Sequence, residues 1–305
     1  MRLGAHMSTA GGIWRALERG AHVGCEVVQL FVKNNMQWFG KLHGPDDIAR
    51  YANQLAADRI ACVFGHTGYL INLAAPASEN RDKSIKSLVQ EIKLATELGL
   101  PFLVMHPGAH LGQGEETGIH QVATGLNEVF TLTRTSPVRI ALENTAGQGT
   151  CLGHRIEHLA KIYTQVKQPS RLGICLDTAH FFAAGYDIRT PKGWDVAISE
   201  VKRMVGLNEI LAFHLNDSKT PLGSRVDRHE HIGKGRLGKR AFAHIVNDER
   251  FVNHPGCLET PKSADLHEDR ENLALLRSLT TLESKVPSSK SPRQSLNQHC
   301  SIHER

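Results

Sequence analysis

The segment Ile140–His180 reads IALENTAGQGTCLGHRIEHLAKIYTQVKQPSRLGICLDTAH and contains one complete strand–helix–strand unit. Its two apolar runs, Ile140–Leu142 and Gly173–Leu176, are nearly continuous, which is typical of parallel strands that are covered on both faces. The segment between them, Gly153–Val166, has the apolar spacing of an amphipathic helix. The unit therefore predicts an α/β fold with parallel strands.

The same pattern recurs along the chain and gives eight apolar runs in all. A helical segment such as Asp82–Leu98, which Gly99 ends, or Gly118–Thr133 separates one run from the next. Eight strands that alternate with helices predict a closed (β/α)₈ TIM barrel, and an open doubly wound sheet is the alternative. The six further runs are Leu3–Ala5, Val27–Val32, Ile60–Phe64, Phe102–Met105, Ile210–Leu215 and Cys257–Leu258.

Length and composition fit one barrel domain. The chain has 305 residues, of which 40% are hydrophobic and 22% charged, and a barrel needs about 250 residues. The net charge of +5 suits a polyanionic partner without identifying one. Neither a signal region nor an apolar stretch of about 20 residues is present, so we expect a cytoplasmic protein without a membrane segment. The six scattered cysteines predict free thiols rather than a disulfide framework or a thiolate zinc site.

The last part of the chain has a different composition. Residues 282–305 are rich in Ser, Pro, Lys and Gln and poor in apolar side chains. Such a segment buries too little surface to offset the entropy lost on ordering. We therefore predict a barrel domain of residues 1–281 and a disordered tail of residues 282–305, whose His299 and His303 are not ligands.

Side chains that can bind metals follow six consecutive strands. A single histidine there is usually structural, and a single carboxylate often caps the next helix. Six in succession would meet at one mouth of a barrel, where their carboxylates would repel one another unless cations lay between them. Imidazoles and carboxylates without thiolates suit zinc, with manganese as the second choice. The residues are His66, His106, Glu143, Asp177 with His180, His214, and Glu259.

A basic segment, SRVDRHEHIGKG (residues 224–235), follows the seventh strand and adds further candidates. Asp227 and His229 point to the same side of an extended segment and can hold one ion; His231 is in the same phase and is not excluded by spacing. Basic loops are often merely solvated, but beside a metal cluster such charges indicate phosphate contacts. The basic residues are Arg225, Arg228, Lys234 and Arg236.

Several of these motifs together resemble the endonuclease IV family. They are HPGAH, ENTAGQG, LDTAHFFAAGYD, FHLNDSK, GSRVDRHEHIGKG and LETP, and the resemblance extends from GAHMSTAGG near the start to about Leu276. It implies three metal ions per chain, usually zinc, with Glu143 and Glu259 as the catalytic residues. The implied ligand sets are His66, His106 and Glu143; Glu143, Asp177, His214 and Glu259; and His180, Asp227 and His229.

The resemblance also implies an activity and a partner. Members of this family cut double-stranded DNA on the 5′ side of abasic sites, leaving a 3′-hydroxyl and a 5′-deoxyribose phosphate, and they trim blocked 3′ ends. The nucleophile is a hydroxide that bridges two metals, and the family favours a monomer. These properties are expectations for this chain.

Two loops resemble the DNA-contacting loops of the family. They are FVKNNMQWFG (residues 31–40) and TGYLINLA (residues 67–74). In the family, the residues at the positions of Tyr69 and Leu70 fill the gap left by a flipped abasic nucleotide. The alternative is that these two residues only anchor their loop to the barrel. Met36 departs from the pattern, because family members carry Arg there. Met36 can wedge between bases but cannot pair with a phosphate.

Two other functions remain open at this point. A metal-dependent sugar isomerase or epimerase on a related barrel would share the strand-end ligands but use one or two metals. The third set, His180 with Asp227 and His229, argues against that function. A DNA-lesion-binding protein without catalysis would be expected to lack at least one ligand, and none is missing.

Overall fold

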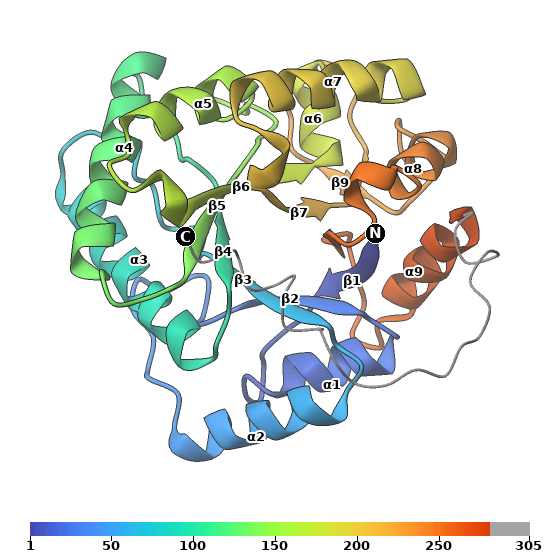
Figure 1. Ribbon diagram of the computed structural model, residues 1–305, viewed down its shortest axis with the longest axis horizontal. Helices are drawn as coiled ribbons and strands as arrows, with labels where there is room; N and C mark the ends of the chain where they lie inside the picture. The colour runs from blue at the N-terminus through green and yellow to red at the C-terminus, as the bar shows by residue number, and fades with distance from the viewer. Residues whose placement is uncertain (281–305) are drawn as a thin grey trace.

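The computed structural model describes residues 1–280 and confirms the predicted TIM barrel. Eight strands close into a barrel in the order β1-β10-β7-β6-β5-β4-β3-β2, and each neighbouring pair is parallel. Figure 1, which looks along the barrel, shows the strands at the centre and the helices around them. The strands are β1 (Arg2–His6), β2 (Val27–Phe31), β3 (Cys62–His66), β4 (Phe102–Met105), β5 (Arg139–Glu143), β6 (Leu172–Asp177), β7 (Ile210–His214) and β10 (Pro255–Leu258).

The helices lie between consecutive strands, as the sequence pattern predicts. Short 3₁₀ turns at Pro169–Arg171, Leu207–Glu209 and Glu249–Phe251 precede β6, β7 and β10. The helices are α1 (Arg15–His22), α2 (Pro45–Ala57), α3 (Glu79–Glu97), α4 (Glu115–Leu132), α5 (Ile156–Gln165), α6 (Thr178–Ala184), α7 (Pro191–Met204), α8 (Lys239–Val246) and α9 (His267–Leu279).

The predicted boundaries are off by a few residues where local contacts decide them. Helix α3 begins three residues before the predicted Asp82, because the side chain of Ser78 accepts a hydrogen bond from the amide of Arg81 and caps the helix. Strand β3 is shifted by two residues toward the C-terminus, so His66 is its last residue rather than part of the following loop.

A small apolar cluster forms the inside of the barrel. Side chains of a strand alternate between its two faces, so a residue two positions beyond an inward-pointing one also points inward. The cluster consists of Val27, Cys62, Phe64, Phe102, Val104, Ala141, Cys175, Ala212 and Cys257. Two positions beyond five of these lie His66, Glu143, Asp177, His214 and Glu259, and two positions beyond Val27 and Val104 lie Gln29 and His106. The strand periodicity therefore directs these polar side chains into the mouth of the barrel.

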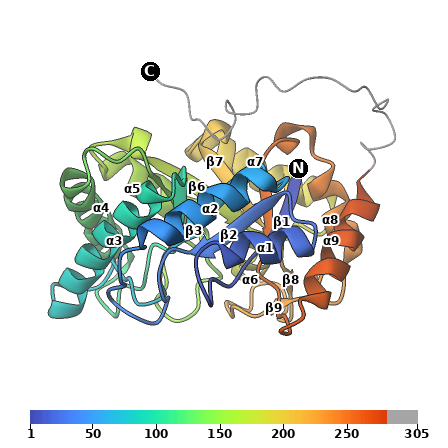
Figure 2. The same ribbon diagram turned by 90° about the horizontal axis from the view of Figure 1, so that it is seen from below.

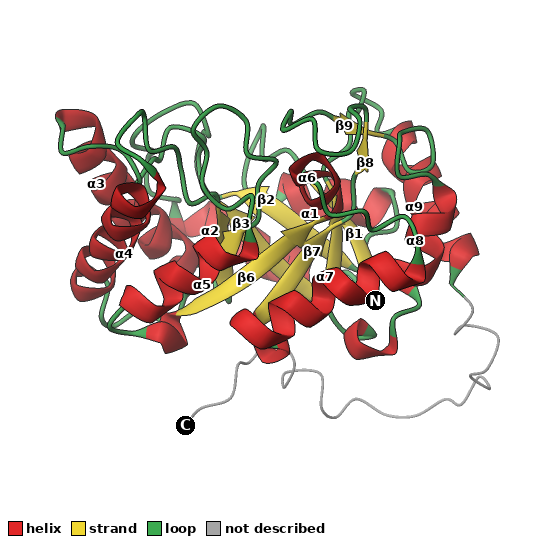
Figure 3. Cartoon of the chain, turned by 90° about the horizontal axis from the view of Figure 1, so that it is seen from above, coloured by secondary structure: helices red, strands yellow, loops and turns green. Residues whose placement is uncertain are grey.

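The loops at the C-terminal ends of the strands form one face of the molecule. Figures 2 and 3 show this face from two sides, with α6, β8 (Asp217–Ser218) and β9 (His229–Glu230) among the loops. The last two pair as antiparallel strands, so the basic segment after β7 is a short hairpin rather than a plain loop.

Three further expectations concern the chain as a whole. No helix within residues 1–280 has the length and apolar character needed to cross a membrane. Within residues 1–280, no disulfide joins the cysteines. The predicted domain boundary and tail, with Cys300, His299 and His303, lie outside the described residues.

Candidate metal centre

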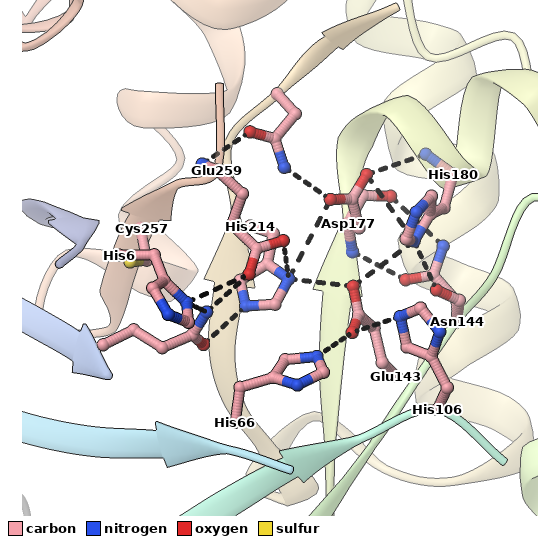
Figure 4. A network of polar contacts seen from close by, with 12 residues as sticks. His6, His66, His106, Glu143, Asn144, Asp177, His180, His214, Cys257 and Glu259 are labelled. Carbon is pink, nitrogen blue, oxygen red and sulfur yellow. Dashed lines mark hydrogen bonds and ion pairs between the residues drawn. The ribbon is translucent and has the colours of Figure 1, made fainter. Parts of the chain in front are cut away.

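The predicted metal-binding residues meet at the mouth of the barrel, and Figure 4 labels all of them except Asp227 and His229. The final residues of β3, β5, β6 and β7 are His66, Glu143, Asp177 and His214. Two more, His106 and Glu259, directly follow β4 and β10. The other three are His180 on α6, His229 on β9 and Asp227 in the loop before it.

Glu143 lies at the middle of this group and is completely buried. Its Oε2 atom is 3.3 Å from Nε2 of His66 and 3.0 Å from Nε2 of His106. Its Oε1 atom is 2.8 Å from Nδ1 of His214 and 3.3 Å from Nδ1 of His180. One carboxylate therefore faces imidazoles from four different segments of the chain, which is the position of a bridging ligand.

Asp177 has two functions because its oxygens point in different directions. Oδ1 accepts a hydrogen bond from the amide of His180 at 2.7 Å and caps α6. Oδ2 accepts from Nδ2 of Asn216 at 2.6 Å and lies 3.7 Å from Nε2 of His229 and 3.9 Å from Nδ1 of His214. The capping role and a ligand role are thus compatible in this residue.

Asp227 is the predicted ligand that lies beside both His180 and His229. Its two oxygens lie 3.1 Å from Nε2 of His180 and 3.3 Å from Nε2 of His229. Its amide donates to Oε1 of Gln148, in the loop that follows Glu143. The hairpin segment is therefore joined to the strand-end ligands by both side-chain and backbone contacts.

Buried Asp217 holds the basic segment in place. Its carboxylate accepts backbone hydrogen bonds from Gly233, Gly235, Leu237 and Gly238 at 2.9 to 3.2 Å. His231, which spacing left open as a ligand, instead has its Nδ1 atom 3.2 Å from Nδ2 of Asn272. The structure thus brings Asp227 and His229 to the centre and directs His231 toward α9.

Apart from Asp227, the predicted ligands fall into three groups, in each of which the ligand atoms lie within 4.8 Å of one another. The groups contain no cysteine. They are His66, His106 and Glu143; Glu143, Asp177, His214 and Glu259; and Asp177, His180 and His229. Asp227, which contacts both histidines of the third group, extends it.

Three histidines have their protonation set by the backbone. A carbonyl oxygen can only accept, so each Nδ1 carries a proton, and in the neutral ring Nε2 carries the lone pair. The Nδ1 partners are the carbonyl of Thr67 at 2.7 Å for His66, that of Asn144 at 2.9 Å for His180, and that of Glu259 at 3.2 Å for His229.

This arrangement fits metal cations. Lone pairs of Nε2 face carboxylate oxygens, and two acceptors repel unless a positive charge lies between them. The Nε2 atoms of His180 and His229 are buried and make no hydrogen bond. Imidazole and carboxylate donors with backbone-fixed tautomers are what zinc or manganese sites need.

The electrostatics of the mouth favour positive charge. Burial alone would lower the pKa of His180, but the carboxylates of Asp177 and Asp227 outweigh burial and raise it well above its ordinary value. Burial alone would raise the pKa of Glu143, but His214 and His106 outweigh this effect and hold it well below its ordinary value. The Glu143 carboxylate therefore stays ionised and available to cations at neutral pH.

Gln29 is a buried residue of the centre that the motif analysis missed. Its amide nitrogen lies 2.5 Å from Oε1 of Glu259 and 2.8 Å from Nδ1 of His6, so its oxygen must face His214. That oxygen accepts from Nε2 of His214 at 2.8 Å. In the neutral ring, Gln29 thus places the proton on Nε2 of His214 and leaves the lone pair of Nδ1 turned toward Glu143. The signal was a polar residue within the otherwise apolar run VVQLF.

The residues expected to contact DNA surround the mouth. Tyr69 and Met36 are 62% and 64% exposed, and Leu70 is half-buried. Arg225 and Arg228 are exposed on the basic segment. These side chains lie at the surface around the buried ligands, and His154 holds Arg225 in its position.

A second group of titratable residues lies beside the centre. Glu115, His154 and His158 come close together, but arginines already use the histidine lone pairs. Nε2 of His154 accepts from Arg225 at 2.5 Å, and Nε2 of His158 accepts from Arg155 at 3.0 Å. The guanidinium groups supply the positive charge here, and His154 fixes the direction of Arg225.

Comparisons with known proteins agree with this geometry. A family model described as a xylose isomerase-like TIM barrel matches residues 17–279. A protein of Chloroflexus aurantiacus named probable endonuclease 4 is 49% identical over 278 residues, which are 91% of this chain and 98% of that protein. The crystal structure of endonuclease IV from Thermus thermophilus superposes with a TM-score of 0.81 at 32% identity and covers 93% of this chain and 100% of that one.

More distant barrels share the fold alone. A D-tagatose 3-epimerase-like protein superposes with a TM-score of 0.68 at 16% identity, over 93% of this chain and 100% of that one. One barrel supports many chemistries, so this likeness carries no function. The close relatives match over nearly their entire length. The chain belongs to the endonuclease IV family and is a nuclease of the hydrolase class.

Proposed function

We propose that this nuclease hydrolyses the DNA phosphodiester on the 5′ side of abasic sites, leaving a 3′-hydroxyl and a 5′-deoxyribose phosphate. We also propose that it trims blocked 3′ ends. It does so with three zinc ions, some of which manganese can replace. Kinship with endonuclease IV supports the DNA substrate, and the three groups of imidazoles and carboxylates support the number of ions.

The ligand sets of the proposal share two carboxylates. Glu143 belongs to the set with His66 and His106 and also to the set with His214 and Glu259, and Asp177 stands between the second set and the third. Divalent cations bound here supply a water-derived nucleophile at neutral pH and neutralise charge on the phosphate. The third set consists of His180, Asp227 and His229.

The protein residues give this chemistry its geometry. Glu143 and Asp177 are fully buried, so their charges act in a medium that screens little. Asn216 donates to Asp177 and accepts from the amide of Glu259 at 2.8 Å, which fixes two carboxylates from different strands. A preorganised centre of this kind stabilises charge that develops on the phosphate without first rearranging.

Lesion recognition is assigned to the exposed residues around the mouth. An abasic nucleotide has no base to stack, so extruding it from the duplex costs less than flipping an intact one. Tyr69 and Leu70, in the loop that follows the ligand His66, would fill the gap. Met36 would add apolar contact, and Arg225 and Arg228 would contact phosphates.

The third ligand set is the observation that carries the proposal. Asp227 and His229 reach the centre from the hairpin and contact His180, so the centre extends beyond the strand ends toward the basic segment. A sugar isomerase needs only the strand-end ligands, whereas a phosphodiester in a duplex needs cations beside a positively charged surface.

The test is incision of a duplex that contains one abasic site. Purified protein is incubated with this duplex and with the same duplex without the lesion, each with and without chelator, and the new ends are identified. We expect a 3′-hydroxyl and a 5′-deoxyribose phosphate from the lesion strand only, and no cut after chelation. Absence of incision, combined with isomerisation of a free sugar, would overturn the proposal.

A further inference from the structure

A buried ion pair lies beneath two loops of the mouth and takes no part in the metal centre. Nζ of Lys33 is 2.8 Å from Oε1 of Glu91, and the side chains are only 3% and 1% exposed. Lys33 begins loop 33–40, which follows β2, and Glu91 lies on α3. Burying two charges is costly unless both are well paired, so such a pair marks a place where geometry is strictly fixed.

Each partner of the pair also holds a loop. Nζ of Lys33 donates to the carbonyl of Gln37 at 2.6 Å, across the same loop. Both carboxylate oxygens of Glu91 lie 3.2 Å from the amide of Gly68, in loop 67–70. The pair therefore joins loop 33–40 to loop 67–70 through one set of charge-assisted contacts.

The two loops also touch directly. The amide of Tyr69 donates to the carbonyl of Asn35 at 3.1 Å. A side chain at Gly68 would be crowded and would push its neighbours back by a few tenths of an ångström, because its Cβ atom would lie 3.1 Å from the Asn35 carbonyl oxygen and from Nζ of Lys33, and 3.2 Å from Oε1 of Glu91. The absence of a side chain at Gly68 therefore favours the close approach of the two loops.

Side chains of helix α3 also hydrogen-bond to the backbone of loop 33–40. Oγ of Ser87 donates to the carbonyl of Trp38 at 2.6 Å. The side-chain amide of Gln90 accepts from the amide of Gly40 and donates to its carbonyl, both at 2.9 Å. Ser87, Gln90 and Glu91 thus hold the loop from beneath.

The tips of these fastened loops are apolar and exposed. Met36, Phe39 and Tyr69 are 64%, 48% and 62% exposed, and the Tyr69 ring rests edge-on against Phe31 at 5.4 Å between ring centres. Exposed apolar groups on a rigid base lose little conformational entropy when they bind. Such a construction suits insertion into a gap in a base stack.

We propose that the Lys33–Glu91 pair is a positioning device that locks the two loops into one lesion-probing unit and thereby sets the preference for internal abasic sites over DNA ends. The inference rests on the proposed function for its substrate. It assigns specificity to residues that lie outside the proposed ligand sets and beneath the exposed loop tips.

The test uses two changes beneath the loops. Gln90→Ala removes only the hold on Gly40, and Lys33→Met with Glu91→Leu replaces the ion pair by apolar side chains without leaving one charge unpaired. Lys93→Ala, on the exposed face of the same helix, is the control. The readouts are amide hydrogen exchange in both loops, metal content, and single-turnover rates on an internal abasic site and on a 3′-phosphate end.

We expect Gln90→Ala to speed exchange in residues 67–70 as well as in residues 34–40, although Gln90 contacts only the second segment. Both variants should lose about tenfold or more in rate on the internal site, because small misplacements of a probing group have large effects. Trimming of the 3′-phosphate and metal content should stay near those of the Lys93→Ala control.

Two results would overturn the inference. One is faster exchange confined to residues 34–40 in Gln90→Ala, which would show that the loops are not coupled. The other is equal loss on both substrates with metal content intact, which would show general structural support. If the wild-type protein cuts no abasic duplex, the proposed function fails together with the specificity claim, while the exchange data still decide whether the loops form one unit.

Discussion

Nδ1 of His214 lies 2.8 Å from Oε1 of Glu143, two residues on different strands whose side chains are both fully buried. The second nitrogen of the same ring donates to Gln29, so the nitrogen that faces Glu143 has no proton in the neutral ring. A lone pair and a carboxylate at this distance repel, and either a proton or a metal cation between or beside them removes the repulsion. This relationship ties the strand ends of the barrel to metal-dependent chemistry.

The first prediction concerns Glu143 itself. Changing Glu143→Gln should lower the rate of abasic-site incision by at least about 100-fold, because a neutral amide is a poor bridging ligand. The fold should persist, since size and shape are retained. Incision rates, elemental analysis and circular dichroism check this. Near-normal turnover with metals still bound would refute the bridging role.

Gln29 offers a test of tautomer control. Gln29→Leu should weaken metal binding about 10- to 100-fold, because His214 loses the partner that fixes its ring. Gln29→Glu keeps an acceptor for His214 but adds a charge beside Glu259, so it should preserve the His214 tautomer and still impair metal binding. Nitrogen-15 NMR of the histidine rings reports the tautomer, and metal titration reports affinity. An unchanged tautomer in Gln29→Leu would rule out this role.

The sequence was sufficient to predict the barrel, because the strands carry nearly continuous apolar runs and ligands follow six of them. The sequence was also sufficient to predict which side chains the structure brings to the mouth. Most of them lie at strand ends, and His180 lies in the first turn of the helix that follows its strand; the exceptions are Asp227 and His229. Alternation along β5 alone, from Ala141 to Glu143, directs that carboxylate inward.

Other features depend on contacts between distant segments. Gln29 and His214 are 185 positions apart, so no local pattern connects them. The spacing of Asp227, His229 and His231 could not separate ligand from non-ligand, because the choice depends on Asn272 in the last helix. The Lys33–Glu91 ion pair could not be predicted from the sequence either, because the two residues meet only when loop 33–40 packs on α3.

Tyr69 and Leu70 should act on lesion recognition more than on hydrolysis. The double change Tyr69→Ala and Leu70→Ala should reduce single-turnover incision at an internal abasic site far more than trimming of a 3′-phosphate, which needs less distortion of the duplex. Met36→Ala should have a smaller effect, because methionine offers apolar contact but no charge. Equal loss of both activities in the double variant would mean that these residues support the centre instead.

Salt should weaken binding to abasic duplex. Lysine and arginine side chains displace counterions from phosphates, so affinity should fall as salt rises from low to physiological concentration. Arg225→Ala should reduce the slope of log affinity against log salt concentration by about one, because one counterion fewer is released. Lys202→Ala, near the end of α7, is the matched control and should leave the slope unchanged. Affinity that does not vary with salt would point to a small, uncharged substrate.

The most direct measurement of the central claim follows activity as metal is returned to the protein. Protein stripped by a chelator is given zinc in steps, and bound zinc and incision of a duplex with one abasic site are measured at each step. The ligand groups predict that incision returns only as the content approaches about three ions per chain, and that the cut leaves a 3′-hydroxyl. Full activity with one bound ion or none would contradict the account.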